Sequence, residues 1–492
     1  MAMEIERKFR LPEGMQELGE GVLLGEGVSL GERREMSLRA TYFDTPDLTL
    51  ARAGVTLRRR TGGSDAGWHL KLPAGGDARR EVGLPLEEGR SELQVPQALR
   101  DRVVDVVGQA PLAPIAQLDT ERAETNLTNA DGTVLALLCE DAVTVRRSGQ
   151  TQQWRELEVE LADGNPADLE TISTALAEAG AQPQPQVSKL VQALGDLLAE
   201  RDDSPLTAAE VVGAYIAAQV GVVQAREQAV RQDAPDAVHK MRVATRRLRS
   251  TLRTFKALMD SERTETLLDQ IKWLADMLGG PRDAEVLKAR LTGALADVPQ
   301  AAVVGPVSER LAHELDTRHA QAHASLVQAL DSPQYVALMD DLVRLVSEPA
   351  FTEEAAQPAT RALRRPLRKA GRKVTRLWEQ AELAEGEEQA ELAHETRKKA
   401  KACRYAWEAV APAYAQGKRA AAAWEEVTES LGTAQDTAVA RERLLELAEL
   451  AQQAGEPTFT YGVLYALELA HQDDAHSEAD QAVWSAAKIS KL

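Results

Sequence analysis

Strict alternation of polar and apolar residues predicts a β-strand at the start of the chain. In Met3–Phe9 the charged residues Glu4, Glu6 and Lys8 share one face, and a mostly apolar set occupies the other. An ordinary half-buried strand with its polar row in solvent would explain one such segment. A barrel or tunnel whose interior is lined with charge is the second interpretation, and the segments that follow favour it.

The next predicted strands repeat the pattern with positive charge. Val55–Arg60 places Arg58 and Arg60 on one face, and Trp68–Leu72 places Lys71 on the face opposite its apolar residues. Such side chains bind phosphate oxygens well, because each is a charged hydrogen-bond donor.

A later predicted strand carries the complementary charge. In Trp154–Leu161 three carboxylates, Glu156, Glu158 and Glu160, follow one another at every second position. Like charges that close repel, so the row requires either a cation between them or free access to water. The carboxylates at both ends of this part of the chain and the Arg and Lys strands between them are complementary: carboxylates bind a hard divalent cation, and the basic residues bind phosphate oxygens.

Six short motifs occur in one order along this part of the chain: Glu4-x-Glu6-x-Lys8, Tyr42-Phe43-Asp44-Thr45, Leu57-Arg58-Arg59-Arg60, Leu70-Lys71-Leu72, Arg79-x-Glu81 and Glu156-x-Glu158-x-Glu160. Together they resemble the CYTH domain, the triphosphate tunnel metalloenzymes, over roughly residues 1–195. The resemblance implies an antiparallel tunnel of about eight strands that binds a triphosphate lengthwise. Members of this family hydrolyse inorganic or thiamine triphosphate, and some cyclise ATP.

The resemblance also implies roles for individual residues. The catalytic set would be Glu4, Glu6, Lys8, Glu156 and Glu158, of which the four glutamates would bind Mg²⁺ or Mn²⁺. The triphosphate-binding set would be Lys8, Arg58, Arg60, Lys71, Arg79, Arg122 and, in a closing segment, Lys189. Glu160 is either a third ligand or the end of its strand. A second ion, or a carboxylate such as Glu6 or Glu158, would orient the attacking water.

The composition changes near residue 200 to Ala, Leu, Glu, Arg and Gln with helical periodicity. We therefore expect a tunnel domain over 1–198, a linker over 199–204 and a helical domain over 205–492 with halves at 205–350 and 351–492. The expected fold class is α+β, an antiparallel β tunnel or barrel followed by an all-α domain of two pseudo-symmetric four-helix bundles.

Two pairs of matching segments indicate an internal duplication of the helical part. His239 and His394 are each followed by basic residues at positions +3, +7 and +10, which lie on one helix face. Leu278–Asp283 is echoed by Leu431–Asp436, and we interpret both as turns. Each half is then most simply a bundle of about four helices.

The paired segments resemble the CHAD domain over roughly residues 205–492, which implies two bundles with approximate two-fold symmetry and a basic surface that binds inorganic polyphosphate. The residues implied for that surface are His239, Arg242, Arg246, Arg249, Arg253, His394, Arg397, Lys401 and Arg404. Gln435 replaces Arg282 in the second half, which implies weaker binding along that edge. A third basic run spans Arg361–Arg376.

Structural explanations compete with these assignments. Basic helix faces are often solvated and paired with acids from neighbouring helices, and a lone helix histidine is commonly a buried hydrogen-bonding group. His319 and His323 share a helix face without an evident third ligand, so scattered surface histidines are the better interpretation. The two occurrences of the basic spacing favour a long polyanion as the ligand.

Composition narrows the possible partners. A net charge of −19 argues against general nucleic-acid or anionic-membrane binding, and 4% aromatic residues provide few platforms for stacked bases. The two cysteines lie in different domains, as expected in a reducing compartment. No apolar run approaches a membrane span in this interpretation, and no signal peptide is evident. We expect a cytoplasmic protein, with polyphosphate granules as one location.

The sequence thus predicts a divalent-metal-dependent hydrolase of inorganic triphosphate or polyphosphate whose helical domain binds polyphosphate. A non-catalytic polyphosphate-binding or granule protein is the alternative from another class. Adenylate cyclase and thiamine triphosphatase rank lower, because neither a base pocket nor an aromatic clamp is evident in the sequence.

Overall fold

The computed structural model describes residues 2–10, 24, 27–63, 65–73, 79–87, 91–147, 150–184, 188–198, 205–470 and 475–492, with the backbone alone at 2–4, 79, 150, 196, 433–436 and 475–478. The chain divides into two compact units, one formed mainly by residues 1–202 and the other mainly by residues 203–492.

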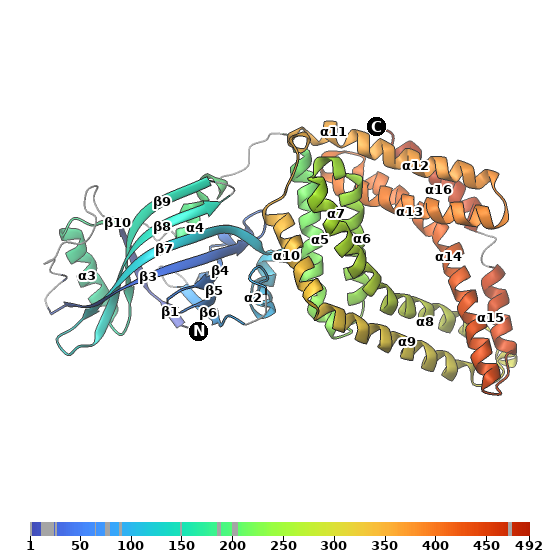
Figure 1. Cartoon of the computed structure of the whole chain (residues 1–492), viewed down its shortest axis with the longest axis horizontal. Coiled ribbons are helices and arrows are strands. Elements are labelled where there is room, and N and C mark those ends of the chain that lie inside the picture. The colour runs from blue at the N-terminus through green and yellow to red at the C-terminus, as the bar shows by residue number, and fades with distance from the viewer. Residues whose placement is uncertain are drawn as a thin grey trace. The chain divides into compact units, whose positions relative to one another are not determined.

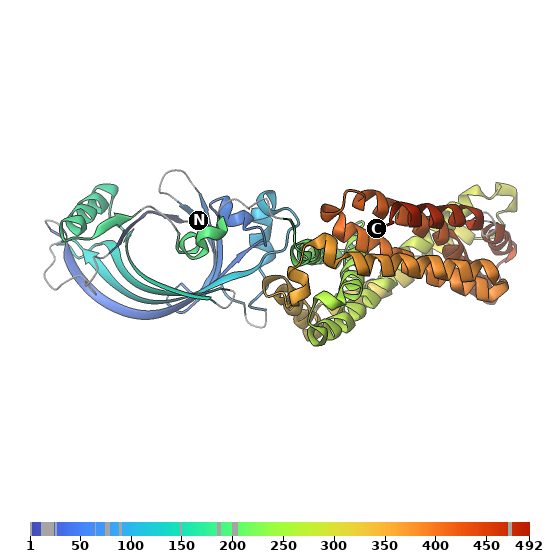
Figure 2. The same cartoon turned by 90° about the horizontal axis from the view of Figure 1, so that it is seen from above.

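The first unit is built on one antiparallel sheet. Its strands are β1 (Ala2–Glu4), β2 (Glu6–Arg10), β3 (Ser29–Asp44), β4 (Thr56–Thr61), β5 (Gly67–Pro73), β6 (Arg79–Leu84), β7 (Ala113–Thr128), β8 (Val134–Arg147), β9 (Gln150–Leu161) and β10 (Gln182–Gln184). The strand order is β1-β6-β5-β4-β3-β7-β8-β9-β2-β10. Figure 2 shows that the sheet is strongly curved.

The N-terminal segment pairs with strands from two distant parts of the sheet. The chain is interrupted at Ile5, so β1 pairs with β6 while β2 pairs with β9. This division, and the short β10 beside β2, raise the number of strands in the described residues to ten, above the expected eight.

Short helices α1 (Thr49–Arg52), α2 (Gln97–Val107), α3 (Pro166–Glu178) and α4 (Lys189–Leu194) complete the unit. The apolar residues that alternate with the charged ones pack beneath them. Leu157 and Val159 lie in one core cluster with residues of α3, and Leu57 and Leu70 lie in another with residues of α2. Burying one face of each strand in this way leaves the charged face for the concave side of the sheet.

The second unit is all helical. The first half contains α5 (Ala208–Arg231), α6 (Ala237–Thr254), α7 (Ser261–Met277), α8 (Gly279–Asp297), α9 (Val307–Leu330) and α10 (Pro333–Ser347). The second half contains α11 (Ala359–Ala362), α12 (Arg364–Leu383), α13 (Gly386–Val410), α14 (Gly417–Gln453), α15 (Phe459–Ala470) and α16 (Ala475–Ile489). An antiparallel sheet followed by an all-helical region confirms the expected order of the two architectures.

The two halves meet at two places. Near the basic helices, α6 packs against α13. Helices α5 and α12 each pack against both α6 and α13. Further away, one hairpin from each half contributes to a shared apolar core: α8 with α9, and α14 with α15 (Figure 1). Arg290 on α8 bonds Glu468 on α15, and Arg310 on α9 bonds Glu456, so two ion pairs reinforce that core.

The segments interpreted as turns are helical. Leu278 joins α7 to α8 with helical dihedral angles, φ −68° and ψ −17°, and Leu431–Asp436 lies inside the 37-residue helix α14. The expectation of turns is therefore wrong. The glycines that suggested turns do not end these helices, because Gly279 begins α8 and Gly432 is buried inside α14.

One helix corrects the expectation that no segment approaches a membrane span. α5 has 24 residues, and its most apolar 18-residue window has a mean hydropathy of 1.3. By length and composition alone, this helix could cross a membrane. Half of that window is buried inside the protein, and α5 packs against α6 and α13. We interpret α5 as a core helix of the second unit.

Candidate functional site

The concave face of the sheet holds a charged cavity of about 280 Å³. We call it the tunnel cavity. Its lining comprises Glu6, Lys8, Met36, Leu38, Ala40, Tyr42, Thr56, Arg58, Arg60, Asp65, Lys71, Glu81, Leu118, Thr120, Arg122, Glu124, Leu137, Glu158, Glu160, Ser188 and Lys189. Eight predicted site residues thus line one cavity, although they come from β2, β4, β5, β7, β9 and α4.

Strand alternation explains how β2 presents its charges. Glu6 and Lys8 line the cavity, whereas Phe9 is buried in the core beneath α3. Arg7 pairs with Glu170 on α3, at 2.6 Å. Register places Lys8 directly opposite Glu158 on β9, and their side chains meet at 2.6 Å.

An acidic cluster lies at the β8 and β9 side of this cavity. Asp141, Glu156 and Glu158 have ligand oxygens within 4.8 Å of one another. Lys189, the first residue of α4, forms ion pairs with all three, at 3.0 Å to Asp141 and 2.7 Å to Glu158. Arg122 on β7 binds Asp141 through two hydrogen bonds of 2.8 and 2.7 Å and reaches Glu158 at 2.9 Å.

These contacts fix the charge states of Glu158 and Lys189. Burial alone would raise the pKa of Glu158, but Lys189, Lys8 and Arg122 outweigh it and hold that pKa well below its usual range. Burial alone would lower the pKa of Lys189, but Glu158, Asp141 and Glu156 outweigh it and raise that pKa. Glu158 and Lys189 are therefore kept ionised by their partners.

A second group of cations lies on β4 and β5. Arg58 donates to the hydroxyl of Tyr42 at 3.5 Å, and Arg60 pairs with Asp65. Lys71 lies 3.9 Å from Glu81.

Charge crowding is evident in this second group. Burial lowers the pKa of Arg60 to about 10, and the like charges of Arg58 and Arg122 contribute to this shift. Burial raises the pKa of Glu81, but a hydrogen bond from His69 and the charges of Lys71 and Arg58 bring it down to about 2. His69 bonds Glu81 at 2.6 Å through Nδ1 and the Asp65 carbonyl at 2.8 Å through Nε2, which fixes its ring.

The structure adds residues that the sequence did not suggest. Asp141 is fully enclosed and central to the acidic cluster, but its neighbours on the same face of β8, Cys139 and Val143, are apolar. Only strand register, which sets Asp141 opposite both Arg122 and Glu156, reveals it. Glu156 lies in the cluster beside the cavity. The side chains of Glu4 and Arg79 lie outside the described residues.

The acidic cluster has the chemistry of a divalent-cation site. Oxygen donors from three carboxylates suit Mg²⁺ or Mn²⁺. Glu156 Oε1 is buried and pairs with Lys189, but it has no hydrogen-bond partner among the described residues. Glu6 and Glu160 also face each other directly in register and line the cavity, an arrangement of like charges that a cation would stabilise.

A second cavity, of about 710 Å³, lies in the helical unit. We call it the basic groove. It is lined by Arg246, Arg249, Ser250, Arg253, Thr254, Lys256, Ala257, Glu354, Arg365, Pro366, Lys369, Ala370, Lys373, Lys398, Lys399, Lys401, Ala402 and Tyr405. The basic side chains come from α6, α12 and α13 and the turn after α6, and Glu354 is the only acid among the described lining residues.

Most of this positive charge is not neutralised within the groove. Among the described residues, Arg246, Arg253, Arg365, Lys369 and Lys373 form no ion pair. Burial and the neighbouring Arg253 lower the pKa of Arg249. Burial and Lys373 likewise lower the pKa of Lys399, despite Glu395. Cations that crowd in this way favour an anionic ligand.

Five predicted residues of the helical surface do not line the groove: His239, Arg242, His394, Arg397 and Arg404. Arg242 pairs with Asp283 at 2.9 Å, and Arg404 binds Glu408 and Glu425 at 2.8 and 2.7 Å. Arg397 donates to the Thr428 carbonyl at 3.3 Å. Arg242 and Arg404 therefore point to acids on neighbouring helices, Asp283 and Glu425, and not into the groove.

Comparison with known proteins agrees with the two architectures. The CYTH domain model matches residues 2–193, and the CHAD domain model matches residues 214–445. An uncharacterized protein of Mycobacterium tuberculosis is 38% identical over 485 residues, which cover 94% of this chain and 92% of that protein. The chain therefore belongs to the family of proteins in which an N-terminal CYTH domain is followed by a CHAD domain. Both resemblances found in the sequence are confirmed.

More distant matches are partial. A thiamine-triphosphatase of Macaca fascicularis is 43% identical over 76 residues, 14% of this chain and 27% of that enzyme. The solved structure of PptA from Streptomyces chartreusis is 24% identical with a TM-score of 0.48, covering 57% of this chain and all of that one. CYTH proteins are typically metal-dependent triphosphate hydrolases, and the tunnel cavity lies within the CYTH match.

Proposed function

We propose that this protein is a divalent-metal-dependent hydrolase of inorganic triphosphate or polyphosphate. The observation that carries the proposal is the convergence of carboxylates and cations on one cavity. Asp141, Glu156 and Glu158 all pair with Lys189, and Glu158 lines the tunnel cavity together with Lys8, Arg58, Arg60 and Lys71. A site that only bound anions would gain nothing from such acids. In this proposal β1 and β2 close the curved sheet into a tunnel.

The cations would bind a phosphate chain along its length. Arg58, Arg60 and Lys71 would hold one end of a triphosphate, and Lys8, Arg122 and Lys189 would hold the other. The latter three are paired with carboxylates in the free protein, so substrate binding would exchange part of those ion pairs for bonds to phosphate oxygens. A nucleophile can approach the phosphorus only when the charge of the chain is neutralised.

Asp141, Glu156 and Glu158, joined by Glu6 and Glu4, would hold Mg²⁺ or Mn²⁺. When bound, such an ion neutralises phosphate oxygens and polarises the bond to be broken. Glu158 is a poor proton acceptor, because Lys189, Lys8 and Arg122 hold its pKa well below the usual range. Glu6, which is 20% exposed, lies 3.9 Å from Lys8, lines the cavity and would orient the attacking water.

The helical unit would bind polyphosphate in the basic groove. The groove provides basic residues from three helices with Glu354 as the lining acid among the described residues, and Arg249 and Lys399 carry lowered pKa values that a phosphate chain would reverse. Binding would then be governed by charge and would weaken as salt increases.

Phosphate release distinguishes the possible substrates. The purified protein is incubated with tripolyphosphate, long polyphosphate, ATP or thiamine triphosphate, each with Mg²⁺ or Mn²⁺. The proposal predicts release from the inorganic chains. Release confined to ATP, with cyclic AMP as a product, would identify a cyclase instead, and the absence of any release with intact polyphosphate binding would identify a binding protein.

Thiamine triphosphate is the second candidate substrate because of the 43% identity to the thiamine-triphosphatase over 76 residues. Among the described residues that line the tunnel cavity, Tyr42 is the only aromatic side chain. A single ring offers little surface for the two rings of thiamine. We therefore rank inorganic substrates first.

A further inference from the structure

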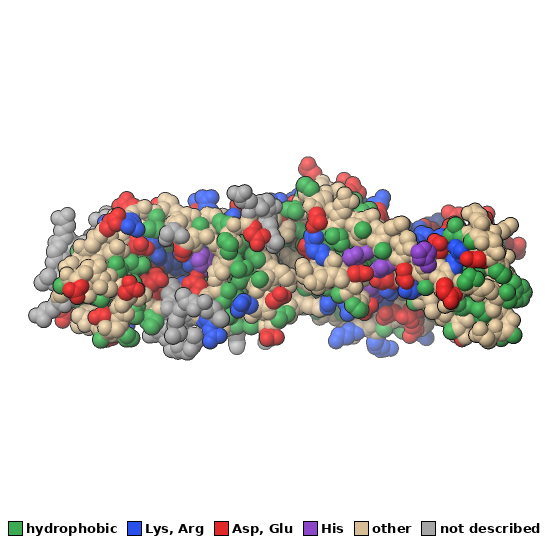
Figure 3. Space-filling view, turned by 90° about the horizontal axis from the view of Figure 1, so that it is seen from below, with side chains coloured by type: hydrophobic (Ala, Val, Ile, Leu, Met, Phe, Trp, Pro, Cys, Tyr) green, Lys and Arg blue, Asp and Glu red, His purple; other side chains and the backbone are tan. Residues whose placement is uncertain are grey.

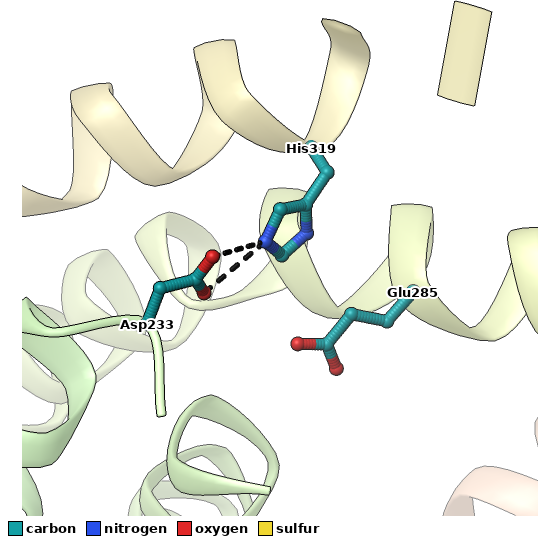
Figure 4. A group of neighbouring side chains, drawn as sticks. All are labelled: Asp233, Glu285 and His319. Atoms are coloured by element: carbon teal, nitrogen blue, oxygen red, sulfur yellow. Dashed lines mark hydrogen bonds and ion pairs between the residues drawn. The ribbon is translucent and has the colours of Figure 1, made fainter. Parts of the chain in front are cut away.

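Three potential metal ligands meet in the helical unit, far in sequence from the tunnel residues. Asp233 follows α5, Glu285 lies on α8 and His319 lies on α9, and their ligand atoms all lie within 4.8 Å of one another. Figure 4 shows the Asp233 carboxylate and the His319 ring facing each other, with the Glu285 carboxylate beside them. The sequence had shown no third ligand for His319 because the other two come from distant segments.

The histidine ring is oriented by a second contact. His319 Nε2 lies 2.9 and 3.1 Å from the two Asp233 oxygens, while Nδ1 lies 3.3 Å from the Pro281 carbonyl oxygen. A carbonyl can only accept, so Nδ1 carries the proton in that contact. Metal-binding histidines are commonly held in this way, with the second nitrogen bonded to a carbonyl and the first directed at the ion.

The aspartate is held at its position by the backbone. Asp233 has a positive φ of 51°, a conformation that non-glycine residues rarely adopt, and its amide donates to the Val230 carbonyl at 3.1 Å. The same carbonyl is the partner of His323 Nε2 at 2.8 Å, and the rings of His319 and His323 are stacked. His323 Nε2 also lies 3.9 Å from Asp233 Oδ1, so His323 lies beside the group of three ligands without being part of it.

We propose that Asp233, Glu285 and His319 form a site for a first-row divalent metal ion, represented by Zn²⁺. One imidazole nitrogen and two carboxylates match the ligands of zinc, with water in the fourth position. The site is partly buried, with His319 21% and Asp233 42% exposed, so an ion can enter from solvent. In the space-filling view, histidine side chains on the helical unit lie next to acidic ones (Figure 3).

A bound ion would tie together three parts of the fold. It would connect the turn between α5 and α6 to both helices of the α8 and α9 hairpin, which in turn contributes to the core shared by the two halves. Glu285 also pairs with Arg282 at 2.9 Å, so metal binding would weaken that pair. An ion that binds only the folded protein raises its stability by mass action.

Zinc binding to the full chain tests the proposal. The wild type is compared with His319→Gln, with Glu285→Gln, which keeps the contact between His319 and Asp233, and with His313→Gln, an exposed histidine on the same helix. Excess Mg²⁺ is added to compete with zinc at the tunnel carboxylates, which are unchanged in all four proteins. Bound zinc per chain is measured by atomic emission, and the unfolding midpoint is measured with and without zinc.

The proposal predicts that His319→Gln and Glu285→Gln each bind zinc at least about tenfold more weakly than the wild type, and lose the zinc-dependent rise in the unfolding midpoint. His313→Gln should behave like the wild type. Equal zinc binding by all four proteins would overturn the proposal. Loss of zinc binding in His319→Gln with full zinc binding in Glu285→Gln would also overturn it, since the three ligands would then not act together.

Discussion

The tunnel cavity and the basic groove use the same basic side chains in opposite electrostatic settings. In the tunnel, Lys8 and Lys189 are paired with buried carboxylates, and their pKa values are raised. In the groove, Arg249 and Lys399 are partly buried and crowded by like charges, and their pKa values are lowered. A cavity of the first kind can bind a cation and an anion together, whereas one of the second kind can bind only the anion. In the function we propose, this difference separates catalysis in the tunnel from retention of the polymer in the groove.

Removal of divalent metal should produce the largest effect. With EDTA in excess, we expect phosphate release from tripolyphosphate to fall at least about 10³-fold, because the charge of the chain is no longer neutralised at the carboxylate cluster. Polyphosphate binding by the same sample should persist, since the groove needs no metal. Activity in EDTA close to that in Mg²⁺ would remove the distinction between the two cavities.

Substitution of a tunnel cation should affect substrate binding. We expect Lys71→Ala to raise KM for tripolyphosphate about tenfold to hundredfold, because a charged hydrogen bond to phosphate is lost. Its effect on kcat should be no larger. Steady-state kinetics at saturating Mg²⁺ measures both, and a fall in kcat with constant KM would assign Lys71 a role in the chemical step.

Charge reversal in the groove should weaken polyphosphate binding and leave tripolyphosphate turnover unchanged. Lys369→Glu replaces an attraction by a repulsion, so we expect the Kd for long polyphosphate to rise about tenfold. Arg368→Glu, at the neighbouring position of α12 but outside the groove lining, is the matched control and should change Kd less. Tripolyphosphate turnover should be unchanged in both. Equal losses of affinity in the two variants would mean that net charge, and not the groove, governs binding.

The acid dependence of stability should show the smallest effect. The pKa of Glu81 is about 2 in the folded protein against an ordinary 4.5, so its charged form stabilises the fold above pH 4.5. That contribution should be lost as pH falls from 4.5 towards 2. The free energies of unfolding of the wild type and Glu81→Gln, measured in urea, should therefore differ most near neutral pH and become equal in acid. A difference in the free energy of unfolding that stays constant across this pH range would show that Lys71 and His69 do not stabilise the charged form of Glu81.

The sequence predicted the tunnel residues better than the groove. Alternation assigns each strand residue to a face, so the pattern by itself was enough to group Lys8, Arg58 and Glu158. It was not enough for Asp141, because the residues that alternate with it on β8 are the apolar Cys139 and Val143, and only register places it in the cluster.

Helix periodicity was less informative. Arg242 and Arg404 share the spacing of groove residues, but each meets an acid on a neighbouring helix that periodicity along one helix cannot reveal. The third basic run on α12, which the sequence did not assign to the binding surface, supplies Arg365, Lys369 and Lys373 to the groove. Packing between helices therefore decides which basic residues share a site.

One pair of variants tests the central claim most directly. Glu156→Gln removes a charge from the acidic cluster, while Glu170→Gln removes one from the exposed face of α3. With saturating Mg²⁺ and tripolyphosphate, we predict that Glu156→Gln loses about 10²-fold or more in kcat and retains polyphosphate binding, whereas Glu170→Gln is unaffected in both. Wild-type turnover in a folded Glu156→Gln protein would contradict the assignment of catalysis to the tunnel carboxylates.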